Sequence, residues 1–286
     1  MTVPEDFAGV PVTVPGRKRR RRWPAAVVAG WIVVLAGISW WSVRHDPATV
    51  PEQQDLGEAM PALRAATGTL LAAAGDGPWA VRLGAPRAET CELTPVRDGT
   101  DAGQDIFLYV PEGQARTALN EVAAALPERY RAAVVPTRAG TRLSLLADAG
   151  AFIAIEAQAQ AADQVLTLSV DTGCRPGKPD RTGTSAAPVA PAGAVPALLG
   201  ETVAALGGVA GSGVSVQEIG CPAGGTAATY RAAAGASGGR PRGVPDGVTP
   251  VWSGAAGWAY RKGPASVVVD ASGERLQVSV TTPCRA

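Results

Sequence analysis

The sequence predicts an α+β protein in which a single N-terminal transmembrane helix is followed by two tandem, related small modules. Three observations lead to this prediction. Six consecutive cations precede 21 uncharged residues, a ten-residue segment recurs at the end of the chain, and each half has one early cysteine and one at its end. We expect each module to combine an antiparallel sheet with one or two helices and to be closed by one disulfide.

The first element is the uncharged run 23–43, which begins directly after the cations of residues 17–22. A helix needs about 20 apolar residues to cross the hydrocarbon core of a membrane. Trp23, Trp40 and Trp41 lie at the two ends of the run, where indole rings favour the headgroup region, and cations hold their end of a span in the cytoplasm. We therefore expect residues 23–43 to bind the lipid bilayer as a single-pass signal-anchor of the cell membrane.

Three other targeting segments fit the run less well. A twin-arginine export signal is indicated only by the arginine pairs that any run of arginines contains. A cleaved secretory signal has a shorter apolar region that ends in small residues, whereas this run ends in Trp40-Trp41-Ser42-Val43. A lipoprotein anchor requires a cysteine just after the run, and the first one is Cys91. Residues 1–22 are then a short basic cytoplasmic tail, and everything after the helix is extracytoplasmic.

A repeat indicates that the exported part is duplicated. Residues 166–175 align without gaps with residues 276–285, and six of the ten positions are identical. Both segments alternate apolar and polar residues, as half-buried strands do. Each follows another strand-like run (151–155 or 265–269), and each half begins with a helical stretch (60–74 or 198–206). The alternative is a coincidence between two similar strands; the shared order of elements favours duplication.

The repeat sets the domain boundaries. We expect a spacer over residues 44–56, an exported α+β module 1 over 57–175, a Pro-rich linker over 176–197 and an exported α+β module 2 over 198–286. Residues 112–130 have helical spacing between two strand-like runs, 106–110 and 133–135. The second copy has the Gly-rich stretch 235–243 in the corresponding place, so this helix is expected in module 1 only.

The four cysteines all lie on the exported side, and an even number in an oxidising compartment indicates disulfides. Four cysteines allow three pairings. Because one cysteine lies early and one lies at the end of each module, the repeat favours Cys91–Cys174 and Cys221–Cys284.

Composition narrows the function classes. Residues 44–286 carry 20 basic and 23 acidic side chains, a net charge of −3, so nucleic acid is not expected as a partner. Frequent alanine and glycine, with arginine in place of lysine, are typical of GC-rich bacterial genomes.

The one histidine, His45, lies beside the membrane run, so both modules lack the imidazole that catalytic triads and zinc sites use. We expect no cofactor and no metal, and take residues 97–105, with Asp98, Asp101 and Asp105, as a solvated hairpin loop.

The densest aromatic group of the exported part is Trp252, Trp258 and Tyr260. If exposed, these rings could contact a glycan or a protein partner. The alternative, packing within a small sheet, is the commoner role of such residues.

Together these observations favour a membrane-anchored extracytoplasmic protein that is not an enzyme and that binds or scaffolds an envelope protein or a cell-wall component. The alternative function is an envelope enzyme with paired carboxylates, such as a glycan hydrolase.

Overall fold

The computed structural model describes residues 23–45, 54–177, 195–209, 213–236, 244 and 246–284. The chain forms two compact units, residues 1–49 and 50–286. The expected basic tail, most of the Pro-rich linker and most of the Gly-rich stretch 235–243 lie outside the described residues.

The first unit contains helix α1 (Trp23–His45). Within the described ranges, no helix is both long enough and apolar enough to cross a membrane. The membrane span expected over residues 23–43 therefore has no support from the described structure.

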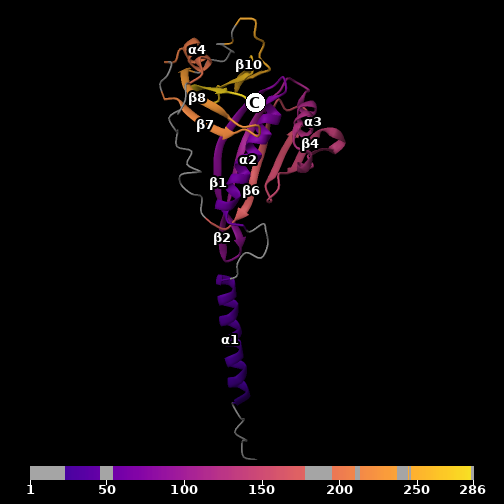
Figure 1. Ribbon diagram of the computed structural model, residues 1–286, viewed down its shortest axis with the longest axis vertical. Helices are drawn as coiled ribbons and strands as arrows, with labels where there is room; N and C mark the ends of the chain where they lie inside the picture. Colours follow the sequence, from indigo (N-terminus) through magenta and orange to yellow (C-terminus); the bar gives the residue numbers. More distant parts are fainter. Residues whose placement is uncertain are drawn as a thin grey trace, which may run out of the picture. The chain divides into compact units, whose positions relative to one another are not determined.

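The second unit contains two six-stranded antiparallel sheets, and Figure 1 labels several strands of each. Sheet 1 belongs to module 1 and has the strand order β1-β2-β6-β5-β4-β3. Its elements are α2 (Leu56–Gly75), β1 (Ala80–Thr94), β2 (Arg97–Tyr109), α3 (Ala115–Ala125), β3 (Ala133–Thr137), β4 (Arg142–Asp148), β5 (Ala154–Gln160) and β6 (Val165–Arg175), with short 3-10 turns η2 (Glu128–Tyr130) and η3 (Arg138–Gly140) on either side of β3.

Sheet 2 belongs to module 2 and has the order β7-β8-β12-β11-β10-β9. Its elements are α4 (Ala197–Ala205), β7 (Ser215–Gly220), β8 (Thr226–Ala236), β9 (Trp252–Gly254), β10 (Gly257–Lys262), β11 (Ala265–Asp270) and β12 (Arg275–Thr281). Counted within its own module, each sheet has the order 1-2-6-5-4-3, with a helix before the first strand. This shared topology supports the duplication predicted from the repeat.

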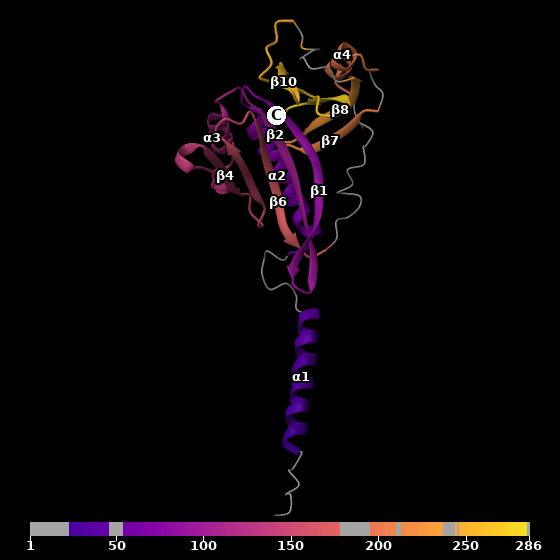
Figure 2. The ribbon, with the colours of Figure 1, turned by 180° about the vertical axis from the view of Figure 1, so that it is seen from behind.

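Helix α2 covers one face of sheet 1. Asp55 caps the helix, because its carboxylate accepts a hydrogen bond of 2.8 Å from the Gly57 N–H. Figure 2 shows α2 against the long strands β1, β2 and β6. The apolar side chains of α2 and α3 form one core with the inward side chains of this sheet, including Leu83, Ile106 and Leu168, all buried. Period-2 alternation therefore directs the other side chains of sheet 1 away from the helices.

The two sheets of the second unit pack together. Strand β1 is an edge of sheet 1, and its backbone polar groups meet side chains of sheet 2. Ser266 Oγ accepts a hydrogen bond from Val81 N–H (3.0 Å), Thr229 Oγ1 accepts one from Leu83 N–H (3.1 Å), and Arg231 donates one to the Leu83 carbonyl (2.9 Å). Sheet 2 thereby satisfies an edge that would otherwise be free to pair with another strand.

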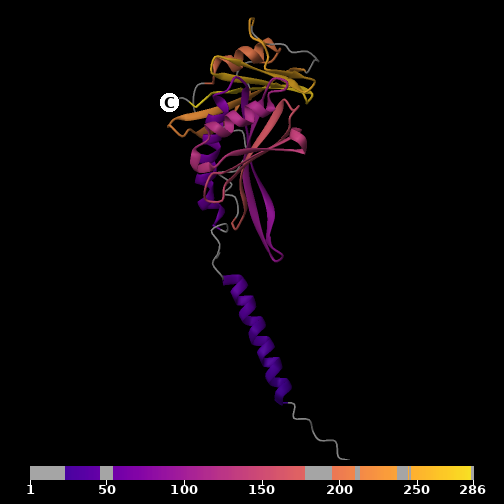
Figure 3. The ribbon, with the colours of Figure 1, turned by 90° about the vertical axis from the view of Figure 1, so that its right-hand side faces the viewer.

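Helix α4 covers the opposite face of sheet 2. It packs with Tyr230, Val267 and Val280 in a separate core. Figure 3 shows α4, in orange, on the side of sheet 2 that faces away from sheet 1. Sheet 2 thus has a helix on one face and strand β1 on the other.

Two local expectations change. Residues 97–105 are not a loop but the first part of β2, because the turn of the β1–β2 hairpin lies earlier, at residues 95–96. The expected strand 151–155 begins later, at Ala154, because Ala151 and Phe152 have positive φ values of 50° and 57°. The module 1 helix is confirmed but is shorter than 112–130.

Candidate functional site

The structure confirms both predicted disulfides, Cys91–Cys174 and Cys221–Cys284. Cys91 lies on β1 and Cys174 on β6, and both strands pair with β2. Strands two places apart in a flat sheet are separated by about 9.6 Å, beyond the ~7 Å limit for a disulfide. The observed Cα–Cα distance is 5.9 Å. Register shifts in both pairings of β2 provide the extra coiling that brings the cysteines together.

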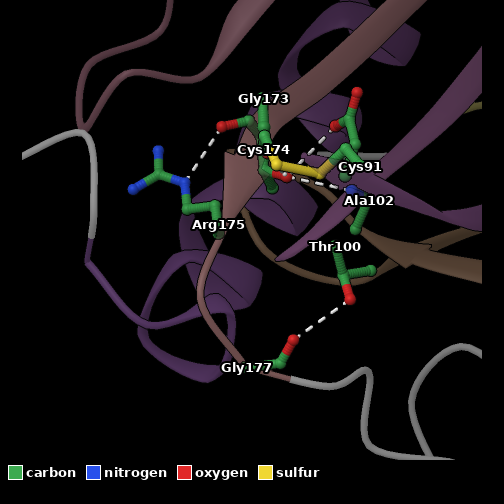
Figure 4. Close-up of a disulfide and its surroundings, with 9 residues drawn as sticks. Cys91, Thr100, Ala102, Gly173, Cys174, Arg175 and Gly177 are labelled. Carbon is green, nitrogen blue, oxygen red and sulfur yellow. Dashed lines mark hydrogen bonds between the residues drawn. A yellow bond between two sulfur atoms is a disulfide. The ribbon is translucent and has the colours of Figure 1, made fainter. Parts of the chain in front are cut away.

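Figure 4 shows the surroundings of this first disulfide. The Thr100 hydroxyl donates a 3.0 Å hydrogen bond to the Gly177 carbonyl, and the Ala102 N–H donates one of 3.0 Å to the Thr172 hydroxyl. Gly177 also lies against Asp55, which caps α2. The disulfide therefore ties β1 to the end of β6, and the segment that follows β6 lies against the start of α2.

A charged cluster spans β1, β2 and β6. Arg87 donates to Asp105 at 2.5 Å and also forms an ion pair with Asp171, and Ser169 donates to Asp105 at 2.7 Å. Arg87 and Asp171 are both register partners of Gly103, so their ion pair crosses β2 directly over this glycine. A Cβ on Gly103 would lie 2.8 Å from Arg87 Nη2 and from the Val170 carbonyl, and closer still to Asp171.

The cluster perturbs two pKa values. Burial, with Asp101 and Asp105 adding to it, raises the pKa of Asp171 to about 6, against the opposing effect of Arg87. Burial lowers the pKa of Arg87, but the three surrounding carboxylates outweigh it, so the net direction is upward. The pKa of Asp171 therefore lies closer to neutral pH than that of an ordinary aspartate.

The face of sheet 1 that points away from α2 and α3 is called the open face here. Cross-strand pairing places its side chains in rows, such as Leu146–Glu156–Ser169–Asp105. One corner, at Ala80 and Tyr109, is covered by sheet 2. The rest carries mostly polar side chains, several of them exposed: Arg82, Arg87, Asp105, Phe107, Arg142, Ser144, Leu146, Glu156, Gln158, Gln160, Thr167, Ser169 and Asp171.

Two hollows adjoin the open face along β4 and β5. The first, of about 360 Å³, is called the basic hollow and is lined by Arg138, Thr141, Arg142, Gln158, Ala159, Gln160 and Asp163. The second, of about 340 Å³, is lined by Tyr130, Arg131, Leu146, Ala147, Asp148, Ile155 and Glu156. The open face thus has a basic end and an end with carboxylates and exposed leucine.

The aromatic residues proposed for partner contact take different positions. Trp258 is 2% exposed and Tyr260 is fully buried, and both belong to the core beneath α4. The contact role is wrong for these two, because their alternation on β10 directs them to the helix side of sheet 2. Trp252 points to the other side and is half-buried, with its ring 5.2 Å from that of Tyr109 at the covered corner of the open face.

Sequence reasoning missed the open face as a candidate site. The alternation Ile155-Glu156-Ala157-Gln158-Ala159-Gln160 did contain a signal, because it places a carboxylate and two amides on one exposed side of a strand. The cluster of Arg87, Asp105 and Asp171 had no such signal, since it joins three strands far apart in the chain.

No protein-family model matches this chain, and no curated protein matches it. Among solved structures, the chain is similar to a DUF4853 family protein from Actinomyces odontolyticus ATCC 17982, at 13% sequence identity and a TM-score of 0.34. The similarity covers 62% of this chain and 91% of that one. A likeness this distant identifies neither a family nor a function.

Proposed function

We propose that this protein is a membrane-anchored extracytoplasmic binding module, and that the open face of sheet 1 binds an envelope protein or a cell-wall component. The observation that carries the proposal is the use of the equivalent face in module 2. There, the face opposite the helix holds strand β1 through Ser266, Thr229 and Arg231. The same fold therefore already binds a polypeptide edge on this face, within one chain.

The corresponding face of sheet 1 has the groups for such a role. Glu156, Gln158 and Arg142 are exposed and offer carboxylate, amide and guanidinium groups. Residues of sheet 2 cover this face at its Tyr109 corner. An exposed sheet face with polar donors and adjacent hollows is suited to a partner with hydrogen-bonding groups of its own.

Site-specific photo-cross-linking in cells tests the proposal. A benzophenone amino acid is placed at Gln158 on the open face, and at Glu121 on the exposed side of α3 as the matched control. We expect Gln158 to capture a reproducible envelope protein or glycan fragment and Glu121 to capture neither. Equal capture from both positions, or none from Gln158, would contradict a binding role for the open face.

The membrane anchor is proposed from the sequence alone. In the described ranges, no helix has the length and apolarity of a membrane span. The support for the anchor is the 21-residue uncharged run after six cations. Protease added to spheroplasts should remove a C-terminal epitope tag while leaving the N-terminal tail intact. Protection of the C-terminal tag in intact spheroplasts, with digestion after lysis, would place the modules in the cytoplasm.

The alternative of a carboxylate-dependent glycan hydrolase gains no support from Asp105 and Asp171. Hydrolysis requires the sugar to lie between the two carboxylates. Here Arg87 occupies that position and binds both of them.

A further inference from the structure

The basic hollow lies at one end of the open face, where β4 and β5 meet the loops beside them. Its lining combines two guanidinium groups, two side-chain amides, one hydroxyl and one carboxylate, around a volume of about 360 Å³. This volume is in the range of small-molecule sites. Arginine forks recognise carboxylate and phosphate, whereas amides and hydroxyls exchange hydrogen bonds with neutral polar groups such as sugar hydroxyls.

The two arginines of the hollow are available for a ligand. Within the described residues, Arg138 has no side-chain hydrogen bond or ion pair, and Arg142 donates only a 3.2 Å hydrogen bond to the amide oxygen of Gln158. The carboxylate in the hollow, Asp163, accepts a 2.7 Å hydrogen bond from the Gln160 N–H and lies in no ion pair of the described part. The two arginines and the single carboxylate give the hollow a net positive charge.

A turn of unusual backbone conformation brings Arg138 to this position. Arg138, Ala139 and Gly140 have consecutive positive φ values of 50°, 55° and 86°. The first two are not glycine, and L side chains rarely adopt this left-handed region, so the backbone of the turn is strained. Arg116 of α3 holds the turn by donating a 2.8 Å hydrogen bond to the Gly140 carbonyl. The strained turn and its support place Arg138 beside Arg142 at the mouth of the hollow.

We propose that the basic hollow binds the carboxylate or phosphate group of an anionic saccharide. Arg138 and Arg142 bind the anionic group, and Gln158, Gln160 and Thr141 bind sugar hydroxyls. This inference rests on the proposed binding function of the open face and names the chemical class of its ligand. Arg116 acts as a positioning residue through the turn.

Calorimetric titration of the full chain in a non-ionic detergent tests the proposal with three probes: glucuronate, glucose 6-phosphate and neutral glucose. We expect at least one of the two anionic sugars to bind about tenfold or more tightly than glucose, since hydrogen bonds to charged groups are the stronger ones. The preferred anion then distinguishes a carboxylate-bearing from a phosphate-bearing ligand. Anionic sugars that bind no better than glucose, or that show no binding at millimolar probe concentrations, would overturn it.

Matched variants connect the binding to the hollow. Arg138→Gln and Arg142→Gln should each weaken binding of the anionic sugar by about tenfold, whereas Arg275→Gln, an exposed arginine of sheet 2, should leave it unchanged. Both hollow positions are exposed, so circular dichroism should show intact folding. Equal weakening by all three variants would indicate non-specific charge attraction and overturn the proposal.

Cross-linking from Gln158 separates this inference from the proposed function. Capture that disappears in the Arg138→Gln/Arg142→Gln double variant supports both. Capture that persists unchanged in the double variant supports the binding function and overturns the anion site.

Discussion

Replacing Asp171 with asparagine should not destabilise the protein at neutral pH, although it removes an ion-pair partner of Arg87. Burial raises the pKa of this carboxyl from 3.8 to about 6, so the folded environment favours the protonated form over the carboxylate. Asparagine resembles that protonated form in size and in lacking charge. Arg87 retains Asp105 as a partner in the variant.

The magnitude follows from linkage between protonation and folding. One pKa unit corresponds to about 1.4 kcal/mol, so this rise corresponds to roughly 3 kcal/mol. The Asp171 side chain is 24% exposed, and solvent screening reduces the expected effect to about 2 kcal/mol. Because the folded protein binds more protons than the unfolded chain between about pH 4 and pH 6, this residue makes the free energy of unfolding fall as pH rises through that window.

Urea unfolding followed by circular dichroism at pH 4, 5, 6 and 7.5 measures the effect. The Asp171→Asn variant should match the wild type at pH 4 and equal or exceed its stability at pH 7.5. The matched control, Asp246→Asn at an exposed loop position, should keep the wild-type pH profile. The reasoning would be refuted if the free energy of unfolding of Asp171→Asn fell by more than about 2 kcal/mol at pH 7.5 while its dependence on pH stayed that of the wild type. The ion pair with Arg87 would then contribute more to stability than burial of the carboxylate costs.

Three further substitutions test the packing by the same unfolding assay. Gly103→Ala should lower the free energy of unfolding by about 1–3 kcal/mol, since its Cβ would collide with the ion pair and a backbone carbonyl. The control Gly220→Ala, whose Cβ would enter open space, should change it little. A similar loss in both variants would contradict the ion-pair crossing. Thr229→Val should cost about 1–3 kcal/mol by leaving a buried N–H of β1 unpaired, and a neutral result would mean that water reaches this edge. Replacing both Cys221 and Cys284 with alanine should cost about 2–4 kcal/mol; no loss would show that the second disulfide is dispensable.

The repeat allowed much of the fold to be predicted from sequence. Cysteines at equivalent places in two copies selected one of three disulfide pairings, and the structure has that pairing. The strand-like run 265–269 and the final strands also lie where alternation predicted them. These features are local or are fixed by comparing the two copies, so one sequence contains enough information.

Other features depend on contacts that no local pattern encodes. Gly99 and Gly103 suggested a loop, but both lie in β2. A side chain at Gly99 would collide with the Arg175 carbonyl and Leu93, and one at Gly103 would collide with the ion pair that crosses it. Alternation correctly placed Trp258 and Tyr260 on one side of a strand. It did not say which side is buried, because both faces of sheet 2 are covered in the fold.

The two copies of the module use the same face differently, and this difference supports the proposed binding role of the open face. In sheet 2, small hydroxyl residues such as Ser266 and Thr229 allow β1 to approach closely and satisfy its edge. In sheet 1, longer side chains such as Glu156 and Gln158 extend into solvent at the equivalent strands. A long side chain on this face of sheet 2, Arg231, is itself engaged by β1, because it donates to the Leu83 carbonyl. The exposed polar side chains of the other copy, and Arg142, whose side chain donates to Gln158, are the groups that the proposal assigns to a ligand outside the described chain.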